Sequence, residues 1–358
     1  MLIELIQVAL GHRDRLSTTP TAENWKTMYN GAVLQAVAGV CFTAIQKLPP
    51  NQRPPQNLYW EWLGLVTKIQ QQNELMDRRT AEVWQRLKGA GLDAVVLKGQ
   101  GVAVSYGELA SFRQSGDIDI WVKGGYQTVC DYVQKTAPTL DVAYHRFHFD
   151  IFPDTEVELH HRPTLMRNLL DDRKLARWYN SFGADSSVYL EDKGFAVPPA
   201  AFNRIFILTH IYRHFLFEGI GLRQMMDYYF VLKSLTPNPS PKGEGSDYQQ
   251  LLKQLGLLKF AEALMWILHT QFGLPESKLI CAPNEKEGRF VLDEIMATGN
   301  FGRGEKRYHF KRMKTVRRMT IHGTHLLLHY PSEVIWTPVW LAYHKVWKWN
   351  MKRKIKHG

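Results

Sequence analysis

Two aspartates separated by one residue are the most chemically informative feature of the sequence. Asp117 and Asp119 stand in the segment "GDIDIWV", whose polar and apolar residues alternate as in a half-buried strand. Alternate residues of a strand project to the same face, so both carboxylates lie on one side. Their negative charges repel each other, and a divalent cation between them would remove that cost. Carboxylate oxygens suit Mg²⁺ or Mn²⁺, which also bind nucleotide phosphates.

A third carboxylate that could complete a metal site lies in the segment "EVELH". Glu156, Glu158 and His160 share one face of a predicted strand, with Glu158 in the centre. Transfer of a nucleotidyl group by two metal ions needs such an acid on a strand beside the aspartates. The alternative is a polar strand end without metal, because an isolated Asp-x-Asp pair often occurs by chance.

The segment "LKGQG" at 97–101 predicts a phosphate-binding turn upstream of the aspartates. Lys98 and Gly99 end a predicted strand, and Gln100 and Gly101 open a helix, so backbone N–H groups would face a bound phosphate. Glycine lets the chain approach a ligand closely because it has no Cβ atom. Lys98 is a candidate for a direct contact with phosphate.

Arg113 and Gly116 lie on the approach to the aspartate strand and complete the candidate nucleotide-binding residues. Arg113 could clamp a triphosphate, or equally pair with Glu108 or Glu158. Gly116 directly precedes Asp117.

Further polar residues lie on helices predicted beyond the sheet. His210 and His214 are four residues apart on one helix face, which fits either a metal site or a polar stripe facing a cleft. Arg223 and Asp227 have the same spacing, which is typical of a helical ion pair. We expect His160, His210, Arg223 and Asp227 to border a cleft where an acceptor would bind.

These segments together resemble a known family. The series "LKG", "SYG", "GDIDIWV" and "VELH" is similar to the uncharacterised nucleotidyltransferase family of the DNA polymerase β superfamily, as are "GLRQMMD" at 221–227 and "TGNFG" at 298–302. The resemblance implies that Gly99, with Gln100 or Gly101, holds the nucleotide phosphates. It also implies that Asp117, Asp119 and Glu158 bind two metal ions. The superfamily's usual Gly-Ser or Gly-Gly pair is Gly-Gln in this chain.

The pattern of apolar residues predicts an α/β (α+β) protein in three parts. Residues 1–88 form a helical segment that packs on the core, and residues 89–163 form a small mixed sheet of four or five strands. The strands are expected at 94–97, 116–125, 142–152 and 155–163. Residues 164–358 form an all-α domain, interrupted by a flexible insertion at 236–247 that is rich in proline and glycine. Its helices are expected at 199–217, 221–235, 247–272, 285–298, 305–329 and 334–355.

Composition and charge narrow the class of protein. The 358 residues include 45% hydrophobic and 22% charged residues, which excludes a disordered or fibrous chain. The net charge is +11, and residues 303–358 hold 14 basic residues against two acidic ones. This excess indicates a polyanionic partner, such as nucleic acid or an anionic surface.

The three cysteines form no CxxC motif, and Met1 to Leu10 lacks the pattern of a signal peptide. No apolar run is long enough to cross a membrane. We therefore expect a cytoplasmic protein.

The sequence predicts an enzyme that transfers a nucleoside monophosphate from an NTP to an unidentified acceptor hydroxyl, with Mg²⁺ or Mn²⁺ as cofactor and release of pyrophosphate. Two alternatives stay open. One is a catalytically degenerate nucleotide-binding module, and the other is a nucleic-acid-binding protein that uses the basic carboxyl-terminal helices.

Overall fold

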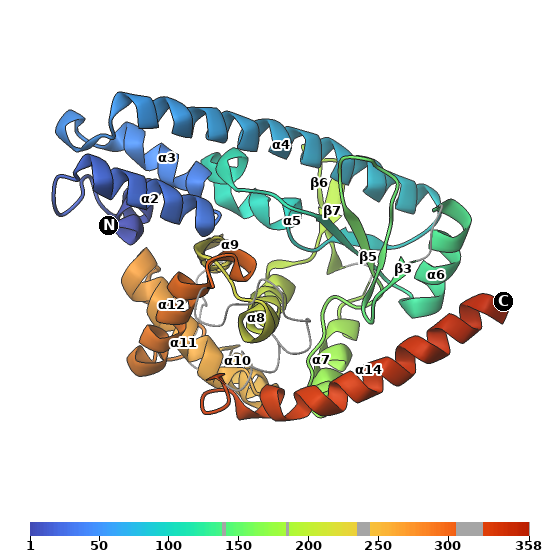
Figure 1. Ribbon diagram of the computed structural model, residues 1–358. Coiled ribbons are helices and arrows are strands. Elements are labelled where there is room, and N and C mark those ends of the chain that lie inside the picture. Colours follow the sequence, from blue (N-terminus) through green and yellow to red (C-terminus); the bar gives the residue numbers. More distant parts are fainter. Residues whose placement is uncertain (138–140, 184–185, 235–243, 306–324, 358) are drawn as a thin grey trace.

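The computed structural model describes residues 1–137, 141–183, 186–234, 244–305 and 325–357. A small mixed sheet lies between a long amino-terminal helix on one side and carboxyl-terminal helices on the other (Figure 1). The predicted mixed α/β fold class is thereby confirmed.

The amino-terminal segment is helical, as predicted. It contains α1 (Leu2–Ala9), α2 (Ala22–Leu34), α3 (Ala38–Lys47) and α4 (Gln56–Gly89). Thr21 begins α2 with a capping box, in which its hydroxyl accepts from the backbone of Asn24 and the Asn24 side chain accepts from the backbone of Thr21. The proline-rich stretch before α4 contains only the 3₁₀ turn Pro50–Gln52.

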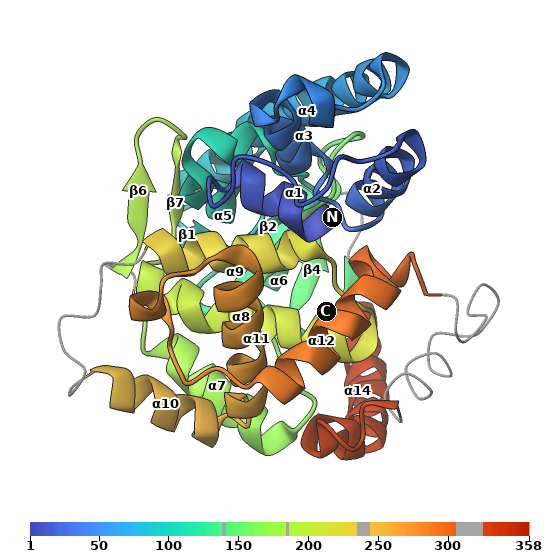
Figure 2. The ribbon, with the colours of Figure 1, turned by 90° about the vertical axis from the view of Figure 1, so that its left-hand side faces the viewer.

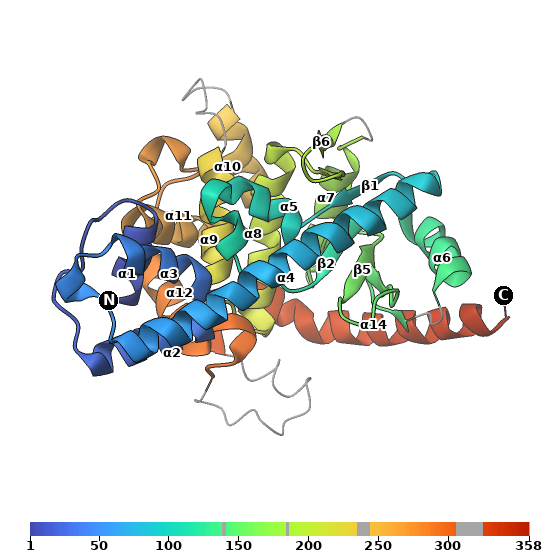
Figure 3. The same cartoon turned by 90° about the horizontal axis from the view of Figure 1, so that it is seen from above.

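Helix α4 belongs to two hydrophobic cores, because its 34 residues run along the length of the molecule (Figure 3). Trp62 and Val66, in its first half, pack in a core shared with the carboxyl-terminal helices. Val83 and Leu87, in its second half, pack in a smaller core against the sheet. The helix therefore fixes the sheet relative to the helical body.

The five-stranded sheet has the order β1-β2-β5-β4-β3. Only β2 and β5 are parallel to each other, and the remaining pairs are antiparallel. The strands are β1 (Ala94–Val96), β2 (Ile118–Val122), β3 (Asp141–Val142), β4 (Arg146–His148) and β5 (Val157–His160). The single strand predicted at 142–152 is wrong, because the chain turns back on itself at 143–145 and forms the β3–β4 hairpin.

The two faces of the sheet differ in character. Ile118, Ile120, Val157 and Leu159 lie in the smaller core with residues of α4 and α6 (Gly125–Thr136). Trp121, on the opposite face of β2, stacks on Phe202 of α8 (Ala200–Phe217), with ring centroids 5.5 Å apart. The face that carries Asp119 and Glu158 is thus turned toward the helical body.

The carboxyl-terminal part is mainly helical, with α7 (Leu169–Asn180) and α8 followed by α9 (Leu222–Ser234), α10 (Glu244–Gln254), α11 (Leu258–Phe272), α12 (Glu285–Thr298) and α14 (Pro331–His357) (Figure 2). The predicted single helix at 247–272 is divided at Gly256, whose φ of +67° is unfavourable for other residues. The predicted helix at 305–329 falls largely on residues 306–324, outside the described residues. So does the predicted insertion at 236–247, except that α10 begins at Glu244.

A two-stranded hairpin, which the sequence did not predict, lies within the predicted all-α domain. It consists of β6 (Val188–Leu190) and β7 (Phe195–Val197). Both strands have only three residues and are separated by the polar stretch Glu191–Gly194, so neither gives a clear alternating pattern. Phe195 and Val197 complete the smaller core beside β1.

Among the described helices, none is both long enough and apolar enough to cross a membrane.

The start of α14 docks onto the start of α7 through a buried carboxyl group. Glu333 accepts hydrogen bonds from the backbone N–H groups of Arg167 (2.7 Å) and Asn168 (3.0 Å). Asn168 in turn caps α7 with its side chain. Burial raises the pKa of Glu333 to about 7, although the two N–H groups oppose this shift.

The raised pKa predicts that this docking weakens as the pH rises. The folded protein keeps its proton on Glu333 up to about pH 7, whereas the unfolded chain loses it near pH 4.3. The folded state therefore binds more protons in this window, and the free energy of unfolding falls with rising pH by on the order of 3 kcal/mol. Glu333→Gln cannot titrate and should lack this part of the decrease. Urea unfolding at several pH values checks it, and parallel pH profiles for the two proteins would contradict it.

Candidate active site

Three buried polar side chains form a cluster on two parallel strands. Asp119 of β2 lies directly opposite Glu158 of β5, and His160 follows on the same face of β5. Alternation produces this arrangement, because the intervening Ile118, Ile120, Val157 and Leu159 point into the core on the other face. One ligand atom from each of Asp119, Glu158 and His160 lies within 4.8 Å of the others.

Basic groups compensate the charges of this cluster. His160 Nε2 lies 2.7 Å from Asp119 Oδ1, and Lys98 Nζ lies 2.9 Å from Asp119 Oδ2. The Lys98 ammonium also lies 3.6 Å from Asp117 Oδ2, so it stands between the two aspartates. Arg146 of β4 donates to Glu158 Oε2 at 2.6 Å. Each of these acids therefore has at least one basic side chain beside it.

The pKa shifts follow from this pairing. Burial would raise the pKa of Asp119, but Lys98 and the hydrogen bond with His160 hold it well below its ordinary value. Burial would lower the pKa of His160, but the hydrogen bonds with Asp119 and Glu158 raise it. The pKa of Lys98 is likewise raised by Asp117 and Asp119 against the effect of burial. The favoured state has negative aspartate and positive lysine and imidazolium.

Asp117 occupies a different position from the other predicted metal ligands. Its side chain is 37% exposed, and it lies outside the set whose ligand atoms come within 4.8 Å of one another. The structure thus brings Asp119 and Glu158 together with His160, while Asp117 lies at the edge of the cluster beyond Lys98.

A small cavity of about 30 Å³ beside Asp117 collects most of the other predicted site residues. Residues from the turn after β1, from the approach to β2 and from α8 and α9 line it. Among them are Lys98, Gly99, Arg113, Gly116, Asp117, His210, Arg223 and Asp227. Residues that are far apart in the sequence therefore converge on one place, while His160, also predicted to border a cleft, is not among the lining residues.

Of Gly99, Gln100 and Gly101, which were predicted as a phosphate turn, only Gly99 lines the small cavity. Gly99 has a φ of +60° and lines the cavity, in agreement with a turn that needs glycine. Gln100 is directed elsewhere, because its side chain donates hydrogen bonds to Asp77 and to the backbone of Asn73 on α4. Gly101 is required by packing, since a Cβ atom there would lie 2.5 Å from the carbonyl oxygen of Val96.

The ion pair predicted between Arg223 and Asp227 is wrong, and Arg113 takes Asp227 as its partner instead. Asp227 binds Arg113 through two hydrogen bonds of 2.7 and 2.9 Å, and it also accepts one from Tyr106 at 2.6 Å. Arg113 therefore pairs with neither Glu108 nor Glu158. Arg223, four residues before Asp227, donates instead to the backbone oxygen of Gln114 at 2.9 Å.

The two arginines keep donors available at the cavity. Arg113 Nη1 and Arg223 Nε have no hydrogen-bond partner among the described residues, and both residues line the cavity. His210, on the neighbouring α8, has its pKa lowered well below the ordinary value by burial and by Lys98, so it is neutral. This arrangement favours an anionic group beside Asp117.

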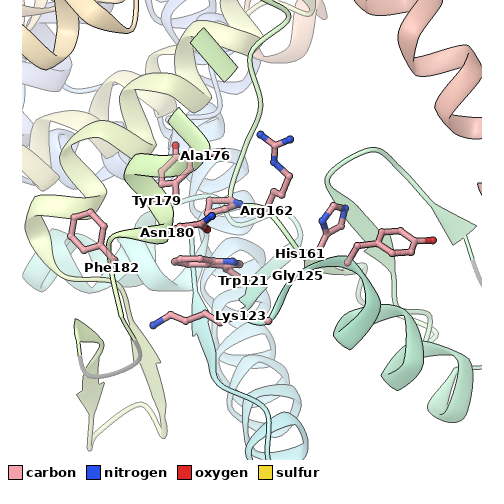
Figure 4. A pocket seen from close by; sticks show the side chains of 12 residues that line it. Trp121, Lys123, Gly125, His161, Arg162, Ala176, Tyr179, Asn180 and Phe182 are labelled. Carbon is pink, nitrogen blue, oxygen red and sulfur yellow. The ribbon is translucent and has the colours of Figure 1, made fainter. Parts of the chain in front are cut away.

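A second and larger cavity, of about 640 Å³, lies at the carboxyl ends of β2 and β5 (Figure 4). Trp121 lies at its centre, with Phe182 to one side and His161 to the other. Lys123 and Arg162 also line it, and no acidic residue does among those that the structure describes. Its size is typical of a pocket for a small molecule. Trp121 and His161 are close in sequence to Asp119 and His160, so the cavity borders the cluster.

Arg146 and Arg213, two basic residues near the cluster, were not among the predicted site residues. Arg146 lies on the same face of the sheet as Glu158, and the alternation Arg146-Phe147-His148 is the pattern that places it there. His145 lies with its ring 5.3 Å from that of His160, and burial lowers its pKa well below the ordinary value. Arg213 of α8 approaches from the helical side, with its pKa lowered by burial. Local spacing contains no indication of this contact.

Comparison with known proteins agrees with the class that the fold and cluster define, a nucleotidyltransferase-like α/β protein. The chain belongs to the family described as uncharacterised nucleotidyltransferase, which matches residues 21–273. The predicted family is thereby confirmed, and membership supports nucleotidyl transfer as the general chemistry.

Comparison with solved structures gives one match of low similarity, and comparison with curated proteins gives none. The structure of an antigenic nucleotidyltransferase-like protein from Paracoccidioides brasiliensis has a TM-score of 0.36 and 12% sequence identity to this chain. The alignment covers 60% of this chain and 96% of that one.

The buried pair of Arg113 and Asp227 should be important for stability. Asp227→Leu leaves the Arg113 guanidinium buried without its counter-charge, so the free energy of unfolding should fall by about 3–5 kcal/mol. Adding Arg113→Met should recover much of this loss, because two apolar side chains then replace the pair. Arg86→Ala breaks an exposed ion pair with Glu82 and should cost under about 1 kcal/mol. Denaturant unfolding measures all three, and equal losses for Asp227→Leu and Arg86→Ala would contradict the assignment.

Proposed function

We propose that the protein is a metal-dependent nucleotidyltransferase that moves a nucleoside monophosphate from an NTP to an acceptor hydroxyl and releases pyrophosphate. The observation that carries the proposal is the buried cluster of Asp119, Glu158 and His160 on two parallel strands. It lies directly behind a cavity lined by Lys98, Arg113 and Arg223. Acidic side chains that can bind a metal ion thus lie next to basic side chains that can bind a triphosphate.

The cluster fits a divalent cation. Asp119 and Glu158 offer carboxylate oxygens, and both are almost fully buried, so their negative charges are costly without a cation nearby. His160 would add an imidazole nitrogen once the bound cation displaces its proton, and such a nitrogen suits Mn²⁺ better than Mg²⁺. Asp117 would join them at the exposed edge. When bound, such an ion neutralises charge on the phosphates and positions the reacting oxygens.

The protein side chains would bind and orient the triphosphate. Arg113 Nη1 and Arg223 Nε are donors without partners at the cavity. Lys98 lies between Asp117 and Asp119, and it could transfer its contact from the aspartates to a phosphate oxygen when a cation takes its place. Gly99 leaves the backbone open to the phosphates.

The acceptor would bind in the larger cavity beside Trp121. Aromatic walls together with Lys123 and Arg162 suit a molecule that combines a flat ring with negative charge. The cavity of about 30 Å³ cannot hold a nucleotide, so the nucleotide would enter only as the helices around it move.

A catalytically degenerate nucleotide-binding module is the second candidate, and one observation favours it. Lys98, Arg146 and His160 already balance the charges of Asp119 and Glu158 within the protein. An inactive protein could keep this arrangement without any metal. Nucleotide binding without release of pyrophosphate, in Mg²⁺ or Mn²⁺, would favour this candidate.

Substitution of the central aspartate tests the proposed chemistry. Asp119→Asn keeps the size of the side chain but removes its charge, and transfer should fall by about 100-fold or more. The measurement is incubation with each labelled NTP, Mn²⁺ or Mg²⁺ and a cell extract, followed by detection of labelled acceptor and of pyrophosphate.

Asp131→Asn is the matched control, because Asp131 is an exposed aspartate on α6, away from the cluster. It should retain full activity. Circular dichroism on both variants separates loss of chemistry from loss of fold. Undiminished labelling by a folded Asp119→Asn variant would rule out the proposed role.

A further inference from the structure

Helix α14 exposes a continuous apolar stripe to solvent. Ile335, Val339, Val346 and Trp349 are between 51% and 63% exposed, and Ala342 between them is exposed as well. These five residues follow one another at spacings of four, three, four and three, so they lie along one face of the helix for about 21 Å. Apolar side chains of this size are rarely exposed in such a row.

The opposite face of α14 is already used for packing on the body of the protein. Glu333 and Thr337 are buried there, and Arg167 donates to Thr337 at 3.1 Å. Further along, Trp347 and Trp340 contact Tyr144, with ring centroids 5.2 and 6.0 Å apart. Among the described residues, Ile335, Val339, Ala342 and Val346 therefore stay exposed, because the helix cannot turn them inward without giving up these contacts.

The charge of α14 is strongly positive. Its one acidic residue is Glu333, which is buried against α7. Lys345 and Lys348 are exposed, and the helix continues with Lys352, Arg353, Lys354 and Lys356. The solvent side of α14 thus combines apolar side chains with positive charge and offers no negative charge to balance it.

We propose that α14 binds the surface of a membrane rich in anionic lipids. Such a helix lies in the plane of the interface, where its apolar face enters the acyl boundary and its lysines meet the anionic headgroups. The apolar stripe then contacts acyl chains, and the lysines contact anionic headgroups. The helix itself is not apolar enough to cross a membrane, which agrees with a position on the surface.

Other occupants satisfy only part of the surface. Nucleic acid would neutralise the lysines but leave Ile335, Val339 and Val346 in water. A second copy of the chain would cover the stripe but bring two strongly positive helices together. The anionic membrane uses both the stripe and the charge. This inference is independent of the proposed nucleotidyl transfer, because α14 contributes no residue to the acid cluster.

Vesicle flotation with the full chain tests the proposal. The protein should float with vesicles of phosphatidylcholine mixed with phosphatidylserine, and much less with phosphatidylcholine alone. Added salt should weaken the binding by screening the lysines. Val346→Asp places a negative charge in the middle of the stripe and should lower the partition coefficient at least about tenfold.

Val33→Asp is the matched control, because Val33 is a 43% exposed valine on α2. It should bind vesicles as the unchanged protein does, and equal unfolding midpoints should show that both variants are folded. Equal flotation of Val346→Asp and the unchanged protein would overturn the proposal, as would failure of the unchanged protein to float. If the protein binds no vesicles but is retained on DNA, and Val346→Asp leaves this retention intact, the surface belongs to nucleic acid. If it binds no vesicles but forms a dimer that Val346→Asp dissociates, the surface belongs to a second copy of the chain.

Discussion

The burial of Asp119 is the constraint on which the arrangement of the whole site depends. A carboxylate removed from water is costly unless opposite charges and hydrogen bonds replace the lost hydration. Lys98 and His160 supply these from the turn after β1 and from β5. Glu158 needs the same compensation and receives it from Arg146 of β4. These two buried charges thus fix the relative positions of four neighbouring strands.

The two-faced sheet allows this polar cluster to exist in a stable protein. Ile118, Ile120, Val157 and Leu159 bury one face against α4 and α6, and that apolar contact holds the strands in register. The other face is then free to carry charged groups toward α8, and the charges of Asp119 and Glu158 act on Arg213 of that helix. The candidate chemistry lies on the polar side of a sheet whose apolar side provides much of the stability.

Local pattern predicted much of the fold and the centre of the site. Alternation in "DIDIWV" and "VELH" placed Asp119 and Glu158 on one face, and helical spacing located most of the described helices. What could not be predicted are contacts between distant residues. The Arg113–Asp227 pair joins positions 114 residues apart, whereas the i, i+4 spacing suggested Arg223 as the partner. The direction of the Gln100 side chain likewise depends on Asp77 of α4, which no spacing within the turn reveals.

Helix α4 limits the ways in which the site can open to a ligand. Its residues pack both in the core of the helical body and in the core of the sheet. Midway along it, Asn73 donates hydrogen bonds of 2.7 Å to the backbone oxygens of Ser111 and Arg113, just before β2. The sheet and the helical body therefore cannot separate by a hinge motion unless α4 bends or loses its packing on one of them. The other wall of the cavity beside Asp117 is formed by α8 and α9. The Arg113–Asp227 pair ties α9 to the segment before β2, so widening the cavity requires α8 to shift or this pair to open. The sheet and its acids then form the fixed wall of the site, and the helical wall is the part that would have to move.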